Sequence, residues 1–227
     1  MPLIIAIAVL ALAVIFGPQL WAKSILKYHN KHRDEIPGTG GELAIHLIES
    51  CKLEGVTVER IPAGDHYDPI DKVVRLSESV HDGKSLTAVV VAAHEVGHAI
   101  QDRLGYVPLR LRTNLVKIAR FSEGLGAIIL IALPFITALT RIPTTGILML
   151  IVGIVVLFVP VAVHLVTLPV EFDASFKRAL PVLSAGYIPA REMPAARRIL
   201  TACALTYVAA SLSAVLNFSR WIYFLRR

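Results

Sequence analysis

The stretch VVVAAHEVGHAIQ, residues 89–101, places two histidines and a glutamate inside an otherwise apolar run. His94 and His98 are four residues apart, so in an α-helix they lie on one face, about 6 Å apart along the axis. Two imidazoles at this spacing can both reach one Zn²⁺, at Zn–N distances of about 2.0–2.1 Å. The stretch therefore predicts a helix that contributes two ligands to a zinc ion.

Glu95 lies about 100° round such a helix from His94, beside the two ligands rather than among them. A carboxylate there can accept a proton from a water whose pKa zinc has lowered, which is the chemistry of the HExxH motif. Gly97 leaves one side of the helix bare for a close neighbour, at a cost of about 1 kcal/mol in helix propensity relative to alanine.

The alternative to a metal site is a structural role for these residues. The bare HExxH pattern occurs by chance in roughly one chain in a hundred of this length, and a single buried histidine is usually structural. Burying three ionisable groups in an apolar helix without a partner would, however, be costly. The context therefore favours the metal.

A catalytic zinc usually has three protein ligands, and here the third has to come from a distant part of the chain. No further histidine follows His98 at a spacing that would complete the site locally. The downstream carboxylate candidates are Glu123, Glu171, Asp173 and Glu192. His164 is a rival ligand, although it lies inside a strongly apolar block.

Glu171 is the candidate that we favour. The stretch PVEFDASFKRAL, residues 169–180, can open a helix just after its proline, and Glu171 would then share a face with Ala174, Ser175 and Arg178. The small residues on that face would allow close packing against the histidine helix. Asp173 would point elsewhere, either as a surface or capping acid or as a group that supports a ligand.

The composition indicates a membrane protein, since 55% of the 227 residues are hydrophobic and they gather in blocks. The net charge is +6, and the basic residues cluster beside these blocks. That placement fits lipid headgroups better than nucleic acid, for which no binding motif is present. Cys51 and Cys203 lie far apart in different kinds of segment, so we expect no disulfide and a reducing compartment.

We therefore predict an α+β fold class, as an integral membrane protein with three or four transmembrane helices and a small catalytic lobe. The expected segments are an N-terminal transmembrane helix at 1–22, a cytoplasmic catalytic lobe at 23–118, a transmembrane hairpin at 119–167, a second catalytic segment with the third zinc ligand at 168–198, and a C-terminal transmembrane or interfacial helix at 199–227. Two spans between His98 and Glu171 would leave both on one side of the membrane, and the basic flanks make that side the cytoplasm.

Local signals place the elements of the lobe. Helical spacing of apolar residues predicts a helix within 41–56, and the stretches 55–61 and 71–77 are typical of strands, with a connection rich in turn formers. Ser85 can cap the histidine helix and Gly105 can end it.

Three stretches together are more specific than any one of them: GDHYDPIDKVVRLS (64–77), AAHEVGHAIQD (92–102) and PVEFDASFKRAL (169–180). In this order, with the hydrophobic blocks between them, they resemble the YugP-type zinc-dependent membrane metallopeptidases, the neutral zinc metallopeptidase family. The resemblance covers nearly the whole chain. It implies a zincin-like catalytic lobe, zinc as the cofactor, and peptide-bond hydrolysis.

The last stretch is also similar to the glutamate-containing element of the wider gluzincin membrane peptidases. There the glutamate is the third zinc ligand, which would be Glu171. An aspartate that supports a zinc-binding histidine falls on Ser175, which is a departure from the pattern. The resemblance implies an edge strand that pairs with substrate backbone, comprising Lys72, Val73, Val74, Arg75 and Leu76, with an ordinary core strand as the alternative. His66 and Arg178 are candidates to stabilise the oxyanion, with a turn residue and an ion pair to Asp173 as the respective alternatives.

The function expected from these features is that of a multi-pass membrane zinc endopeptidase with its active site facing the cytoplasm. Its partners would be the lipid bilayer and membrane or misfolded polypeptides, with no nucleic acid, and any regulatory or oligomeric partner is left open. One alternative is a zinc-binding scaffold without proteolysis, against which the intact Glu95 argues. A zinc transporter is a further alternative, but it would need more ionisable residues within its spans.

Overall fold

The computed structural model describes residues 2–140 and 144–206. It is mostly helical and has one small sheet. The elements up to the sheet's last strand are α1 (Pro2–Tyr28), α2 (Gly40–Ser50), β1 (Thr57–Ile61), β2 (His66–Asp68) and β3 (Val73–Ser77). They are followed by α3 (Glu78–His81), α4 (Leu86–Arg103), α5 (Val107–Thr140), α6 (Thr144–Phe172), the π-helix η1 (Asp173–Ala179), α7 (Leu180–Val182), the π-helix η2 (Leu183–Tyr187) and the 3₁₀-helix η3 (Ala190–Glu192). Residues 193–206 are helical as well.

The histidine helix α4 is the centre of the lobe. Ser85 caps it, since its Oγ accepts a hydrogen bond from the backbone N–H of Ala88 at 3.1 Å, and Gly105 follows its end with a φ of +65°. Apolar residues from the sheet, from α2, from the π-helices and from residues 193–206 form one core with α4. Nearly every side chain of α4 is buried as a result, so any polar group on it needs a partner.

The sheet has the strand order β1-β3-β2. β3 pairs in parallel with β1 on one side and antiparallel with β2 on the other, with Val74 opposite both Val58 and Tyr67. The expectation that 72–76 form an exposed edge strand is therefore wrong. The sequence reasoning missed β2 because this strand has three residues and lies among turn formers. Within the described residues, β2 and β1 are the edges.

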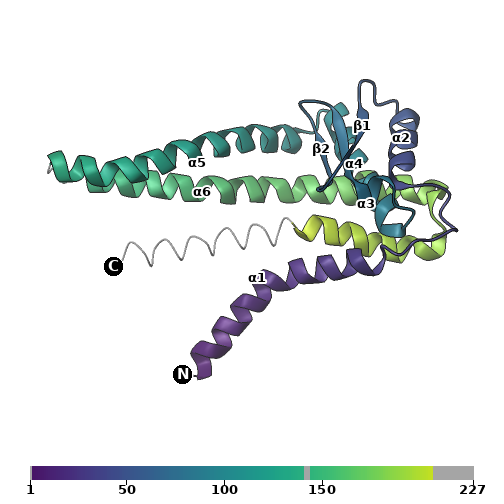
Figure 1. Cartoon of the computed structure of the whole chain (residues 1–227), viewed down its shortest axis with the longest axis horizontal. Coiled ribbons are helices and arrows are strands. Elements are labelled where there is room, and N and C mark those ends of the chain that lie inside the picture. Colours follow the sequence, from purple (N-terminus) through teal and green to yellow (C-terminus); the bar gives the residue numbers. More distant parts are fainter. Residues whose placement is uncertain (1, 141–143, 207–227) are drawn as a thin grey trace.

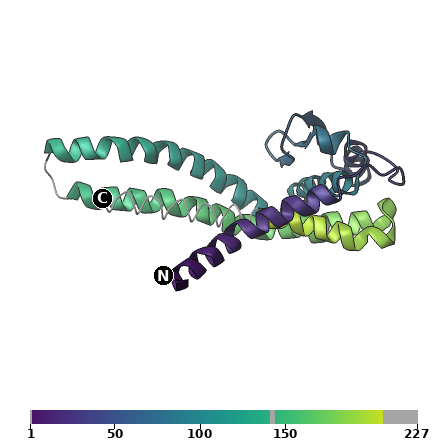
Figure 2. The ribbon, with the colours of Figure 1, turned by 60° about the horizontal axis from the view of Figure 1, so that its bottom comes forward.

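Helices α5 and α6 form a long antiparallel hairpin that extends away from the lobe (Figure 1). They lie side by side along most of their length in both views, whereas α1 lies below them in Figure 1 and passes in front of the lobe end of the hairpin in Figure 2. At the lobe end, α6 continues directly into η1, so the chain returns to α4 without a loop. This continuity places the end of α6 against the histidine helix.

The structure corrects the predicted membrane topology. A transmembrane helix needs about 20 consecutive, predominantly apolar residues, because the hydrocarbon core of a bilayer is about 30 Å thick. Among the described residues, no helix combines that length with that apolar character. The predicted spans at 1–22 and 119–167 are thus wrong, and so is the multi-pass location with a cytoplasmic active site that depended on them. Most of the C-terminal candidate at 199–227 lies outside the described residues.

Candidate metal centre

Three buried side chains from two distant segments, α4 and the end of α6, lie close together. His94 Nε2 lies 3.1 Å from Glu171 Oε2, and His98 Nε2 lies 3.4 Å from the same oxygen. One ligand atom from each residue lies within 4.8 Å of the other two. Glu171 comes from the last turn of α6 and its side chain is fully buried. Two imidazoles and a carboxylate are a donor set that suits zinc, so these residues fit such an ion.

Each histidine is oriented by a hydrogen bond on its other ring nitrogen. The Ser175 hydroxyl donates to the backbone carbonyl of Leu200 at 3.3 Å, so it accepts from His94 Nδ1, which lies 3.1 Å away. The Nδ1–H of His98 donates to the Gln101 carbonyl oxygen at 3.0 Å. With Nδ1 of each ring held in this way, both Nε2 atoms face Glu171, which is the orientation that a shared metal ion requires.

The orientation of the Gln101 amide is fixed by its own partners. Its nitrogen donates to the backbone carbonyl of Val170 at 2.8 Å and to Asp173 Oδ2 at 2.9 Å. Turning the amide round would bring its oxygen against two acceptors, so Oε1 has to face His98. Arg178 Nε donates to the same Asp173 oxygen at 3.0 Å. The predicted residues Asp173 and Arg178 thus form an ion pair that supports Gln101.

Asp173 is buried although it does not share the helix face of Glu171. It is the first residue of η1, and its Oδ2 accepts hydrogen bonds from Gln101 of α4 and from Arg178 of η1. Asp173, Ala174 and Ser175 are all buried where η1 packs against α4. The sequence reasoning assumed α geometry and therefore directed Asp173 elsewhere.

The contact between α4 and η1 depends on Gly97. A Cβ atom added there would lie 2.8 Å from the Ala174 carbonyl oxygen and 3.4 Å from Arg178 Cβ. The predicted close approach at Gly97 is confirmed by this geometry. The backbones of α4 and η1 approach each other at Gly97, one residue before His98. The lack of a Cβ atom at Gly97 therefore sets the separation between the two segments that carry the ligands.

Gly97→Ala is expected to lower the free energy of unfolding by about 1–3 kcal/mol, because the backbone of η1 has to move away. Helix propensity alone would change stability in the opposite direction by about 1 kcal/mol. Gly17→Ala is the matched control, since a Cβ at Gly17 in α1 meets no atom within 4 Å. Denaturant unfolding compares the two variants, and a Gly97→Ala protein as stable as the control would contradict the close contact.

Electrostatics keep the carboxylate of Glu171 ionised. Burial alone would raise its pKa, but the charge of His98 and the hydrogen bonds from His94 and His98 hold the pKa of Glu171 well below its usual range. Arg112 Nη1 lies 3.3 Å from the other carboxylate oxygen, Oε1, which has no hydrogen-bond partner among the described atoms. An ionised carboxylate with a buried oxygen still unbonded is suited to bind a cation.

The pKa of Glu95 is shifted in the opposite direction to that of Glu171. Burial raises its pKa to about 7, with Glu171 adding to the shift and His94 opposing it. Within the described part of the chain, no hydrogen bond to its carboxylate is found. A buried carboxyl group that titrates near neutral pH can both accept and return a proton, which is the requirement for a general acid–base catalyst.

A cleft of about 280 Å³ reaches the metal centre at His98 and Arg112. Its walls are the edge strand β2 with the two residues that follow it, His98 of α4, and one face of α5 that includes Arg112. His66 thus lies in the same cleft as His98. Tyr67 anchors the strand, since its hydroxyl donates to Asp102 Oδ2 of α4 at 3.0 Å. The cleft runs beside a strand with one unpaired edge.

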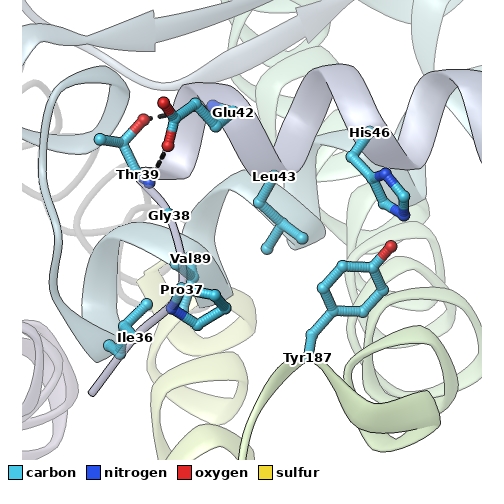
Figure 3. A pocket seen from close by; sticks show the side chains of 9 residues that line it. All are labelled: Ile36, Pro37, Gly38, Thr39, Glu42, Leu43, His46, Val89 and Tyr187. Atoms are coloured by element: carbon cyan, nitrogen blue, oxygen red, sulfur yellow. Dashed lines mark hydrogen bonds between the residues drawn. The ribbon is translucent and has the colours of Figure 1, made fainter. Parts of the chain in front are cut away.

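A second cavity, of about 210 Å³, lies away from the metal centre. Figure 3 shows it between the loop at 36–39, α2, α4 and Tyr187, with Leu43 and His46 among its walls. The Thr39–Glu42 capping box stands at its rim, where each residue bonds the backbone N–H of the other. The two cavities share no lining residue.

Other candidate ligands are not brought to the site. Glu192 forms an ion pair with Arg33 at 2.8 Å, and the side chain of Glu123 is outside the described residues. His164 is absent from the one candidate metal-binding group found among the described side chains. Sequence reasoning missed Gln101 and Arg112. Gln101 stands three residues after His98 on the same helix, which is a signal that could have identified it. No pattern indicated Arg112.

Comparison with known proteins assigns the class. Residues 4–226 match the family described as "Putative neutral zinc metallopeptidase". A relative from Bacillus subtilis (strain 168), "Putative membrane protease YugP", is 34% identical over 222 residues, which cover 97% of this chain and 95% of that protein. No solved structure matches significantly. The chain belongs to this zinc metallopeptidase family, as its three sequence stretches predict.

Proposed function

We propose that the protein is a zinc metalloendopeptidase in which His94, His98 and Glu171 hold the ion and Glu95 is the general base. The observation that carries this proposal is the convergence of the three buried ligand atoms within 4.8 Å of one another. Five of the six ring nitrogens and carboxylate oxygens of these three residues face a polar partner, and the remaining one, Glu171 Oε1, has no hydrogen bond. The family and the printed name of the bacterial relative support proteolysis as the activity.

The residues have separate tasks in this proposal. Bound zinc would supply a Lewis acid that lowers the pKa of a water and polarises the scissile carbonyl. Glu95 takes a proton from the attacking water and gives it to the leaving amine, for which a pKa near 7 is suitable. Ser175 and Gln101 act as positioning residues, because they fix the tautomers of His94 and His98.

The substrate in this proposal is an extended segment of polypeptide, as unfolded proteins provide. Such a segment would lie in the cleft between β2 and α5, where it could pair with the free edge of β2. His66 stands on that strand and is the candidate to stabilise the oxyanion of the tetrahedral intermediate. Arg178 has no part in it, since it is committed to Asp173.

The test is to purify the full chain, measure bound zinc by mass spectrometry, and incubate the protein with casein. We expect about one zinc per chain, cleavage of casein, loss of cleavage on treatment with a chelator, and recovery on adding zinc. Zinc without cleavage of casein would favour a zinc-binding scaffold. A purified protein that binds no zinc would contradict the site as proposed.

A further inference from the structure

One wall of the cleft is a regular stripe on α5. Six residues of this helix line it at intervals of three and four, and they therefore share one face: Leu109, Arg112, Thr113, Val116, Lys117 and Arg120. The stripe begins at the metal centre, where Arg112 contacts Glu171. It then runs away from the centre along the helix, so a peptide in the cleft would meet its residues in order.

The charges along this stripe are all positive. Arg112, Lys117 and Arg120 line the cleft, and the side chains of Lys117 and Arg120 are exposed to solvent. Neither of these two has an ion-pair partner among the residues that the structure describes. Arg112 is already balanced by Glu171, so the unbalanced charge belongs to the outer part of the stripe.

The single acid in the cleft wall is occupied elsewhere. Asp68 accepts a hydrogen bond from Arg75 Nη1 at 2.9 Å, and its other oxygen accepts the backbone N–H groups of Ile70 and Asp71. It therefore does not neutralise the cations across the cleft. Electrostatic complementarity then favours negative charge on whatever enters.

We propose that Lys117 and Arg120 select peptide substrates that carry an acidic side chain a few residues from the scissile bond, an inference that rests on the proposed peptidase function. Arg120 is eight residues beyond Arg112, which is about 12 Å along the helix axis. An extended peptide covers about 3.3 Å per residue, so Lys117 and Arg120 face substrate positions about two to four residues from the bond that is cut.

The expected preference is modest, because the cations are exposed. Ion pairs of this kind change an equilibrium by about two- to fivefold each, so the two together favour an acidic peptide by about tenfold at low ionic strength. The preference falls toward unity in 1 M salt, where the Debye length is about 3 Å. Binding away from the reacting atoms affects substrate and transition state alike, so the effect appears in KM with kcat unchanged.

The experiment uses the full-length zinc-loaded protein and quenched fluorescent peptides with one sequence. Glu or Gln is placed in turn at each of the four positions on either side of the scissile bond, and kcat/KM is measured at 50 mM salt. Wild type is compared with Lys117→Gln/Arg120→Gln and with Lys23→Gln/Lys27→Gln. The second double variant removes the same charge from exposed positions on α1, outside the cleft.

We expect wild type and the α1 variant to cleave one set of Glu peptides about tenfold faster than the matching Gln peptides. The cleft variant should lose that ratio while it keeps the wild-type kcat/KM for the Gln peptides. Cleavage of Gln peptides with no preference for Glu at any position, or an equal loss of preference in both double variants, would overturn the inference alone. Failure of wild type to cleave any peptide would overturn the proposed function, and this inference with it.

Discussion

Glu95→Gln is expected to reduce peptide hydrolysis by about 10²–10⁴-fold while the protein keeps about one zinc per chain. Glutamine has nearly the shape of glutamate but cannot accept a proton from water or return one to the leaving amine. The three proposed ligands are unchanged by this substitution, so metal binding should be unaffected. Zinc content and casein cleavage, measured on the same preparation, check both expectations.

The same variant tests the buried carboxyl group through stability. The pKa of Glu95 in the folded, metal-free chain is about 7, raised from 4.5, so the folded state favours the protonated form. The contribution of this group to stability is fully present below pH 4.5 and is lost as the pH rises through 7. At pH 8 the metal-free Glu95→Gln protein should therefore be more stable than wild type, by up to about 3 kcal/mol.

Denaturant unfolding of the chelated proteins at pH 4 and pH 8 measures this difference. The two proteins should be close in stability at pH 4, and the gap should open as the pH rises. A variant that is inactive because it is unfolded would instead be less stable at both values. Wild-type levels of hydrolysis in a folded Glu95→Gln protein would remove Glu95 from the proposed mechanism.

Glu171→Gln is expected to weaken zinc binding by more than about 100-fold, which exceeds the 10–100-fold effect of losing a hydrogen-bond partner of a ligand. The amide is a poor substitute for an ionised carboxylate as a zinc ligand. It can still donate a hydrogen bond to an imidazole nitrogen of His94, so the metal-free protein should remain folded. Competition with a chelator of known affinity measures the change.

The matched control is Glu192→Gln. Glu192 was the other downstream glutamate that the structure describes, and it pairs with Arg33 at 2.8 Å. Its substitution should leave zinc affinity within twofold of wild type. Equal zinc affinity in Glu171→Gln and wild type would contradict the third ligand, and a loss confined to Glu192→Gln would reassign it.

The part of the fold that could be predicted from the sequence is the part governed by local signals. Spacing, the cap at Ser85 and the stop at Gly105 define α4, and two alternating apolar stretches define β1 and β3. β2 could not be predicted, because three residues among turn formers give no periodic signal. Its absence from the prediction made β3 an edge when it is the central strand.

The features of the site also divide into those that the sequence could predict and those that it could not. The grouping of His94, His98 and Glu171 could be anticipated from helical spacing and from the chemistry of zinc, which needs a third ligand. The contact of Asp173 with Gln101 could not, since it depends on how η1 packs against α4, and no residue preference marks the i→i+5 turns of η1. Arg112 reaches Glu171 through tertiary packing of α5, for which the sequence carries no local pattern.

The distance along the chain between the converging residues has a consequence for how the lobe is held together. His94 and Glu171 are 77 residues apart, and the α5–α6 hairpin lies between them. An ion bound by both would close a loop of this length in the way that a disulfide does, which restricts the unfolded chain by about 4 kcal/mol in the chain-entropy account. Zinc would then act as a reversible cross-link as well as a catalytic ion, and the free energy of unfolding of the lobe would depend on the zinc concentration.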